Sequence, residues 1–261
     1  MGLLFRIAKK VAPADFHPEI DAVGDKIGLR RRRARYAGTR YHCPCCDGRF
    51  SEFLPFGVAR ATRQGAMCPA CGSLERHRML TLYLRRRTKL LEVPTSLLHF
   101  APERRIANWL KGHSNINYVS TDLFSPEAAV RSDITDLLFR DATFDAVICF
   151  HVLEHIPDDH KAMTELLRVL RPGGEALIQV PLYPDQEETF EDPTVTDPRE
   201  RERIFDQSDH VRRYGRDFPR KLERAGFEVE WVEADSYCTP EEIALHGLTR
   251  DTWVAHCRRP R

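Results

Sequence analysis

The sequence predicts an α/β fold in which helices cover both faces of a mainly parallel sheet, preceded by a small cysteine-bearing module. From residue 96 onward, apolar runs that suit strands alternate with segments that have helical spacing. Strands that alternate with helices of about 10 to 15 residues form βαβ units, which build a parallel sheet. Four of the eight cysteines are grouped in two pairs before residue 74. No apolar run approaches the ~20 residues that a membrane span needs.

The charge of the chain also differs between the cysteine-bearing part and the part that follows it. The net charge is +1, but residues 1–94 hold 19 Lys and Arg against 8 Asp and Glu, whereas residues 95–261 hold 21 against 31. Much of the positive excess lies in Arg30–Arg33 and Arg85–Arg87. Such a basic part is consistent with an anionic partner, with docking onto the acidic part, or with solvated helix faces.

The boundaries follow from composition and motifs. We expect a basic N-terminal segment over 1–40, a cysteine module over 41–73, a connector helix over 74–94 and a larger domain over 95–261. The first apolar patch, MGLLF, is broken at Arg6, so it lacks the apolar stretch of a secretory signal. The sequence therefore predicts a cytoplasmic protein.

The cysteine module has the spacing of a metal site. Its pairs are Cys43-x2-Cys46 and Cys68-x2-Cys71, in the segments CPCCDG and CPACGS. Two such knuckles at the ends of a short hairpin give four sulfurs at tetrahedral spacing, which suits zinc. Two disulfides are the alternative, but nothing routes the chain to an oxidising compartment. Because four protein ligands leave no open position, we expect a structural zinc ribbon.

The larger domain can be divided into elements in order. Strands are expected at 96–101, 116–122, 144–152 and 175–181, followed by EVEWVE and TWVAHC. Helices are expected in ERRIANWLKG, over 158–170 and over 217–225, with a further short helix before SDITD at 132–136. Sheets of this kind bind ligands at the carboxyl ends of their strands.

Residues 132–181 carry a more specific signal. They contain the acidic turn at Asp133, the strand FDAV, the triplet LEH ending at His155, and LRPGG before another strand. This segment resembles the second half of class I S-adenosylmethionine (SAM)-dependent methyltransferases of the type 11 kind, and the resemblance extends over about 96–232. It implies a Rossmann-like fold with a mostly parallel seven-stranded sheet, SAM as cofactor and methyl transfer as the reaction.

The resemblance also implies site residues. Asp122, at the tip of the second strand, matches the acidic residue that binds the ribose hydroxyls, and a carboxylate can accept both hydroxyl protons. Asp133 matches the residue that holds the adenine, and His151 matches the position where cofactor and acceptor meet. The further cofactor contacts implied by these matches are Leu123, Ile134 and Phe150.

One loop departs from the family. After the first strand, where the family has a glycine-rich turn, the chain reads LLHFAPERRI at 97–106 without a glycine. His99 takes the usual acidic position, and Ala101 and Glu103 stand among the residues that replace the glycines. Either the loop is rebuilt, with Glu103 or His99 contacting the amino-acid end of SAM, or cofactor binding is lost and the domain is a scaffold.

The long charged stretch 182–216 is predicted to be a lid over the acceptor. Its end resembles the histidine-containing segment of the family, which makes His210 the first candidate for a general base. His151 is the second candidate. Arg212 and Tyr214 would contact the acceptor. The competing interpretation is that His210 fastens the lid to the core.

Two substrate classes are compatible with these features. The lid and the modest net charge favour an O or N atom of a small molecule, sugar or glycan precursor. A zinc ribbon before such a domain also resembles a group of ribosomal RNA base methyltransferases, whose RNA the basic module would grip. Against RNA, the ribbon has no series of stacking aromatics, since its phenylalanines are expected to form its own core.

Overall fold

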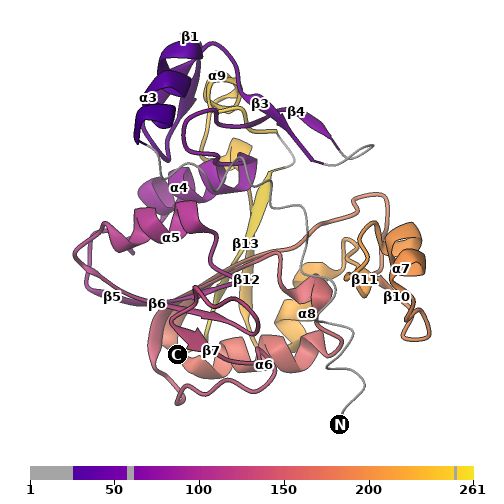
Figure 1. The fold of residues 1–261 in the computed structure, drawn as a ribbon. Helices are drawn as coiled ribbons and strands as arrows, with labels where there is room; N and C mark the ends of the chain where they lie inside the picture. The colour runs from indigo at the N-terminus through magenta and orange to yellow at the C-terminus, as the bar shows by residue number, and fades with distance from the viewer. Residues whose placement is uncertain (1–25, 58–61, 250–251) are drawn as a thin grey trace.

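The computed structural model describes residues 26–57, 62–249 and 252–261. Residues 1–25, which make up most of the expected basic N-terminal segment, lie outside this range. The described chain forms a seven-stranded sheet with a small module above it (Figure 1). No helix in the described part is long and apolar enough to cross a membrane.

The large sheet has the strand order β12-β13-β9-β8-β5-β6-β7. Strands β9, β8, β5, β6 and β7 are parallel, and β13 is antiparallel to both of its neighbours. The predicted fold class, a mostly parallel seven-stranded Rossmann-like sheet, is confirmed. The strands are β5 (Thr95–Phe100), β6 (Ile116–Asp122), β7 (Val130–Arg131), β8 (Phe144–Phe150), β9 (Leu170–Gln179), β12 (Glu228–Glu233) and β13 (Trp253–Arg258).

Helices cover both faces of the sheet, because the central strands bury apolar side chains on both sides. In β5, the neighbours Leu97 and Leu98 are both fully buried, and they belong to different core clusters because successive side chains point to opposite faces. One cluster contains side chains of α4 (Glu75–Arg87), α5 (Arg104–Lys111) and α9 (Pro240–Leu245); the other contains side chains of α6 (Asp159–Val169) and α8 (Phe218–Arg224). In Figure 1 the first two helices lie above the sheet, and α6 and α8 lie below it.

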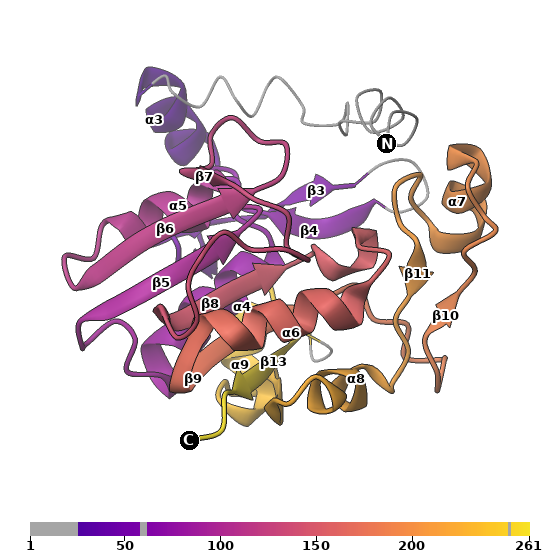
Figure 2. The ribbon, with the colours of Figure 1, turned by 90° about the horizontal axis from the view of Figure 1, so that it is seen from below.

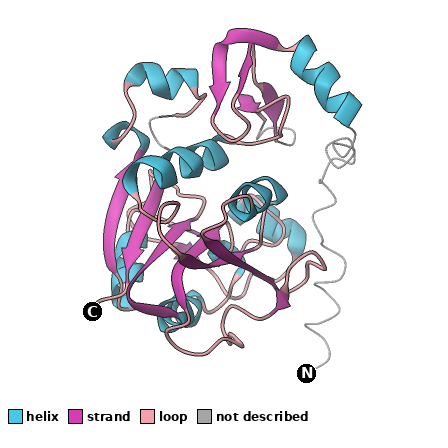
Figure 3. Ribbon diagram, turned by 90° about the vertical axis from the view of Figure 1, so that its left-hand side faces the viewer, coloured by secondary structure: helices cyan, strands magenta, loops and turns pink. Residues whose placement is uncertain are grey.

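The N-terminal module consists of α3 (Lys26–Arg35) and two antiparallel hairpins. The hairpins pair β1 (Ala37–Cys43) with β2 (Gly48–Phe50), and β3 (Leu54–Phe56) with β4 (Arg63–Met67). Phe50 and Phe53 are buried among the cysteines and form the core of the module. Figure 3 shows the module as a separate layer at the top of the molecule.

A buried arginine is one of the links between the module and the larger domain. Arg78 of α4 has no exposed surface and donates to the carbonyl oxygens of Ala66 and Ser73, both at 2.8 Å. It also donates to the carbonyls of His246 at 2.6 Å and Gly247 at 2.8 Å, just after α9. A buried charge is tolerated only when its donors are satisfied. Arg78 therefore fixes the module against the C-terminal part of the chain.

One expectation for the loops is corrected. The short helix expected before SDITD is absent, because Oδ1 of Asp122 accepts from the amides of Phe124 and Ser125 and turns the chain instead. The expected lid has its own structure, with β10 (Phe190–Glu191) paired to β11 (Arg212–Arg213) and α7 (Pro198–Phe205) between them. Two short 3-10 helices, η4 (Leu153–His155) and η5 (Ala234–Ser236), complete the described elements.

Candidate cofactor and acceptor site

The strand order locates the site. Strands β5 and β8 are neighbours, and the chain proceeds from β5 outward to β6 and β7 before it returns to β8. Such a switch point opens at the carboxyl ends of the strands, where open α/β sheets bind their ligands. In Figure 2, β8 points toward the side of the molecule where β10, α7 and β11 lie. The predicted site residues that follow β5, β6 and β8 therefore share one edge of the sheet.

Two residues at this edge have strained backbones. Ala101 follows β5 with a φ of 44°, and His151 follows β8 with a φ of 54°. For a residue with a Cβ, this left-handed region costs about 1–2 kcal/mol. The loop without glycine thus keeps a left-handed turn directly after the first strand. Strain of this kind is found preferentially at ligand-binding sites.

Glu103 has a different role from the one predicted. Its two carboxylate oxygens already accept hydrogen bonds from Arg76 and His77 of α4. Burial would raise the pKa of Glu103, but the charges of His77 and Arg76 outweigh it and hold that pKa well below its ordinary value. The side chain therefore ties the loop to α4 and does not present a free carboxylate to the amino-acid end of SAM.

His99 is buried in β5, with Nδ1 2.9 Å from the hydroxyl of Tyr118. Burial disfavours the charged imidazolium and lowers the pKa of His99 to about 4. The position that is acidic in the family is thus occupied here by a neutral ring at physiological pH.

Asp122 ends β6 at the same edge. Its Oδ1 accepts from the amides of Phe124 at 2.6 Å and Ser125 at 2.7 Å. Within the described chain both hydrogen bonds of this carboxylate fall on Oδ1, which leaves Oδ2 able to accept from a ligand hydroxyl. Leu123 beside it is half-buried.

The predicted adenine contact is made of an exposed residue and a buried one. Asp133 is exposed, and its Oδ1 accepts from the amide and the hydroxyl of Thr135, both at 2.8 Å. Ile134 belongs to the core. Sequence reasoning missed two exposed apolar side chains here, Phe124 at 65% and Leu138 at 75% exposed. An aromatic residue directly after the strand-end Asp-Leu pair was the available signal.

His151 is held by a carboxylate. Its amide donates to the carbonyl of Gln179, and its Nδ1 lies 3.3 Å from Oε1 of Glu154. Phe150, the last residue of β8, is buried beneath this turn. A carboxylate that faces Nδ1 orients a histidine and leaves Nε2 for proton transfer. Glu154 was not among the predicted site residues.

The predicted acceptor contacts are buried. Arg212 donates to the carbonyls of Leu153 at 3.0 Å and Pro157 at 2.8 Å, and the hydroxyl of Tyr214 donates to Asp159 at 2.9 Å. Both side chains are at most 2% exposed. They fasten the segment 182–216 to the core and are not available to an acceptor, which corrects the prediction.

His210 is likewise 3% exposed, with Nδ1 3.2 Å from the carbonyl oxygen of Phe205. Burial lowers its pKa, so the ring is neutral near pH 7. Its burial agrees with the competing interpretation, a histidine that fastens the segment, better than with an exposed general base.

The four predicted metal ligands come together. Sγ of Cys43 lies 3.6 Å from that of Cys71, and Sγ of Cys46 lies 3.9 Å from that of Cys68. Tetrahedral zinc with Zn–S bonds of about 2.3 Å separates its sulfurs by about 3.8 Å, so the donor set fits zinc. All eight cysteines are free thiols. Cys45 contacts the hydroxyl of Thr81 at 3.3 Å and is not part of the cluster.

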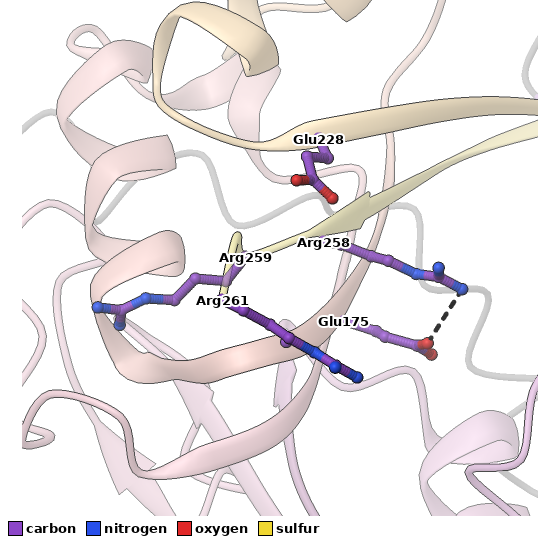
Figure 4. A pocket seen from close by; sticks show the side chains of 6 residues that line it. Glu175, Glu228, Arg258, Arg259 and Arg261 are labelled. Atoms are coloured by element: carbon purple, nitrogen blue, oxygen red, sulfur yellow. Dashed lines mark ion pairs between the residues drawn. The ribbon is translucent and has the colours of Figure 1, made fainter.

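A cavity of about 540 Å³ lies at the opposite edge of the sheet (Figure 4). It is lined by residues at the starts of β9 and β12 and the end of β13, including Glu175, Glu228 and Arg258. Figure 4 shows the ion pair of 3.5 Å between Arg258 and Glu175 across its wall. Since parallel sheets bind ligands at the carboxyl ends of their strands, this cavity is not the cofactor site.

The sequence matches a known domain family over the region that forms this edge. Residues 101–178 match the methyltransferase domain family of type 11. The chain contains a class I SAM-dependent methyltransferase domain. The match begins at Ala101, in the loop without glycine, and continues through β9, so this methyltransferase domain includes the strained turn.

Curated relatives match the chain over a short stretch. The chain is 47% identical over 49 residues to demethylmenaquinone methyltransferase of Clavibacter sepedonicus, which is 19% of this chain and 20% of that protein. It is 43% identical over 49 residues, with the same coverage, to the ubiquinone/menaquinone biosynthesis C-methyltransferase of Idiomarina loihiensis. The chain thus spans about a fifth of the length of these relatives.

Solved structures share the fold. One is the complex between the Haloferax volcanii Trm112 methyltransferase activator and a candidate methyltransferase, with a TM-score of 0.51 at 17% identity, covering 72% of this chain and 91% of that chain. Another is the [4+2]-cyclase SpnF, with a TM-score of 0.51 at 16% identity, covering 80% and 88%. Since one neighbour of this methyltransferase domain is a cyclase, the fold alone does not define the reaction.

Proposed function

We propose that the protein transfers the methyl group of SAM to an O or N atom of a small-molecule, sugar or glycan-precursor acceptor. The observation that carries the proposal is that one edge of the sheet holds three matching features. These are the left-handed turn at Ala101, the available Oδ2 of Asp122, and the His151–Glu154 pair.

The cofactor positions follow from these features. The turn at Ala101 brings the backbone to the carboxyl end of β5, and Oδ2 of Asp122 can accept from a ribose hydroxyl. The exposed side chains of Phe124 and Leu138 offer apolar surface for the adenine ring, and Asp133 stands between them in the sequence. We retain Leu123, Ile134 and Phe150 as the packing that supports these contacts.

SAM held at this edge would supply a methyl group activated by its sulfonium, for transfer to an O or N atom of the acceptor. The acceptor loses one proton in this exchange. His151 is placed to take this proton. Glu154 faces its Nδ1, and the His151 side chain is 35% exposed. Base catalysis contributes about 10²- to 10⁴-fold, and alignment of the acceptor contributes several kcal/mol more.

The segment 182–216 supports a small acceptor. It is bound to the core through Arg212, Tyr214 and the hydrogen bond from the amide of Val211 to the carbonyl of Glu154. The segment is therefore held in place beside the carboxyl ends of the strands, an edge of the sheet that we call the catalytic edge.

For the cysteine ribbon we propose a structural role. We propose that Cys43, Cys46, Cys68 and Cys71 hold one zinc ion. Arg78, which binds Ser73 beside the cysteines, would offset the negative charge of four thiolates. Eight cysteines that form no disulfide are consistent with a reducing compartment, and we place the protein in the cytoplasm on this basis.

RNA remains the alternative acceptor. Exposed arginines on α3 favour it, whereas Phe50 and Phe53 are buried in the ribbon and cannot stack on bases. The test is incubation of zinc-replete protein with methyl-labelled SAM and a cell extract that is then separated into small-molecule and RNA fractions. We expect labelled product in the small-molecule fraction, and about ten- to a hundredfold less of it with Asp122→Asn when SAM is limiting. Label confined to RNA would replace the proposed acceptor class, and no transfer to any fraction would refute the proposal.

A further inference from the structure

A second group of metal-ligating side chains lies at the catalytic edge, far along the chain from the cysteines. Glu154 and His155 belong to η4, directly after β8, and His210 comes from the segment before β11. One ligand atom from each of the three lies within 4.8 Å of the others. Glu154 and His210 are buried, and His155 is about one-third exposed.

The two histidines present the same nitrogen toward this group. Nδ1 of His210 lies 3.2 Å from the carbonyl oxygen of Phe205, and Nδ1 of His155 lies 3.3 Å from the carbonyl oxygen of Asp209. Because a carbonyl only accepts, each Nδ1 carries the hydrogen and each Nε2 carries a lone pair. Metal-binding histidines are held in this way by their other ring nitrogen.

Asp209 adds to this support. Its carboxylate Oδ2 lies 3.4 Å from Nδ1 of His155. A carboxylate behind a histidine makes the opposite nitrogen a better ligand. The two rings also contact each other, at a centroid distance of 4.8 Å and an interplanar angle of 77°.

Glu154 supplies the negative charge that a cation needs. Its side chain is 2% exposed, and Oε2 is buried without a hydrogen-bond partner in the described chain. Oε1 faces His151 at 3.3 Å and Nε2 of His155 at 4.0 Å. Burial of a carboxylate oxygen is costly unless a hydrogen bond or a cation satisfies it.

We propose that Glu154, His155 and His210 bind a divalent transition-metal ion whose open positions take oxygen atoms of the acceptor. Two imidazoles and one carboxylate suit zinc, manganese or iron, whereas calcium and magnesium prefer oxygen alone. Three protein ligands leave positions open, as in catalytic sites. Bonds of about 2.1 Å place two ligands about 3.0 to 3.4 Å apart, so binding draws these atoms together by roughly 1 Å.

This site deepens the proposed function and, in its use, rests on it. Since His151 contacts Glu154, an acceptor bound to the ion would lie beside the base at the end of β8. A metal-bound hydroxyl loses its proton more readily than a free one. The acceptor class is therefore a hydroxyl compound with a second oxygen that can chelate the ion, such as a vicinal diol of a sugar.

The test is titration of Mn²⁺ into protein already loaded with zinc at the cysteines, with the free ion counted by electron paramagnetic resonance. We expect one bound Mn²⁺ per chain, and binding at least tenfold weaker in Glu154→Gln and in His155→Asn. His160→Asn is the matched control, since this exposed histidine of α6 lies outside the group. It should bind as the unchanged protein does.

The result is separate from the proposed function, because it measures binding of the metal alone. SAM binding, measured in the same variants by calorimetry, shows that each is folded. A protein that binds neither Mn²⁺ nor a second equivalent of zinc would overturn the metal site. So would binding that persists in both variants. Metal binding without any SAM binding would support the site and refute the proposed function instead.

Discussion

The ribbon and the catalytic edge each gather metal-ligating side chains, but they treat their polar groups differently. In the ribbon the four sulfurs stand near tetrahedral separations, and the nearby Arg78 has acceptors for its donors. At the edge, one Glu154 oxygen has no hydrogen-bond partner among the described residues, and the backbone of His151 is strained. The ribbon is therefore built as a closed site, and the edge is built to receive a ligand. Changes in the ribbon should cost stability, and changes at the edge should cost binding.

The largest effect is expected in the ribbon. Cys68→Ser removes one of four ligands, and because structural zinc supplies most of the folding energy of such a module, we expect the ribbon to unfold. The free energy of unfolding should fall by at least about 4 kcal/mol, with loss of bound zinc, measured by denaturation and metal analysis. Cys45→Ser is the matched control and should change stability by about 1 kcal/mol or less. Equal effects of the two would contradict a four-cysteine site.

The next effect is a pH dependence that originates at His99 in the central strand β5. The pKa of His99 is about 4 when folded and ordinarily about 6.5, so the unfolded chain binds the extra proton between these values. Stability should therefore be full above about pH 6.5 and fall by about 3 kcal/mol toward pH 4. His99→Gln should flatten this dependence in denaturation curves, whereas His160→Gln should not. Burial also lowers the pKa of His77 and His246, which add to the slope in both variants.

A smaller effect tests the segment beside the edge. Tyr214→Phe removes the hydroxyl that donates to buried Asp159, which should cost about 1 to 2 kcal/mol. Tyr183→Phe removes an exposed contact to Asp206 and should cost less than about 0.5 kcal/mol. We expect SAM affinity to be retained in both, and methyl transfer to fall only in the first. If transfer fell equally in both, the buried hydrogen bond of Tyr214 would not be the contact that positions the segment.

The smallest effect concerns the strained turn. Ala101→Gly relieves a positive φ worth about 1 kcal/mol and adds unfolded-state freedom worth about 0.4 to 1 kcal/mol. Stability should change by less than about 1 kcal/mol, with SAM affinity unchanged. Ala142→Gly, at a φ of 51° in a turn before β8, is the control. A SAM affinity tenfold lower in Ala101→Gly would show that the loop needs its Cβ.

The sequence predicts the strands well where the hydrophobic pattern alone determines them. The apolar run of β8 and the alternating pattern of β6 place those strands within one or two residues. The paired CPxC knuckles predict the cysteine cluster, because ligand spacing is local. Helix signals in two loops were present but unused: Asp197 before Pro198 caps α7, and Thr239 forms a capping box at α9.

Other features depend on contacts between distant residues. Arg78 binds the carbonyl of His246, 168 positions away, and no periodicity predicts that pairing. Glu103 stands where a cofactor contact was expected, but Arg76 and His77 occupy its carboxylate. Arg212 and Tyr214 likewise serve the core, since polar residues in a charged loop do not reveal whether they point inward.

The central claim is that the carboxyl edge of the sheet binds SAM although the loop after β5 has no glycine. It is tested most directly by calorimetric titration of SAM into zinc-loaded protein, into Asp122→Asn and into the control Asp136→Asn. Asparagine keeps an Oδ1 that can cap the loop but loses the charge at Oδ2. We predict micromolar binding to the unchanged protein and the control, with affinity about ten- to a hundredfold lower in Asp122→Asn. Absence of SAM binding in the unchanged protein would contradict the account and leave the domain as a zinc-bearing scaffold.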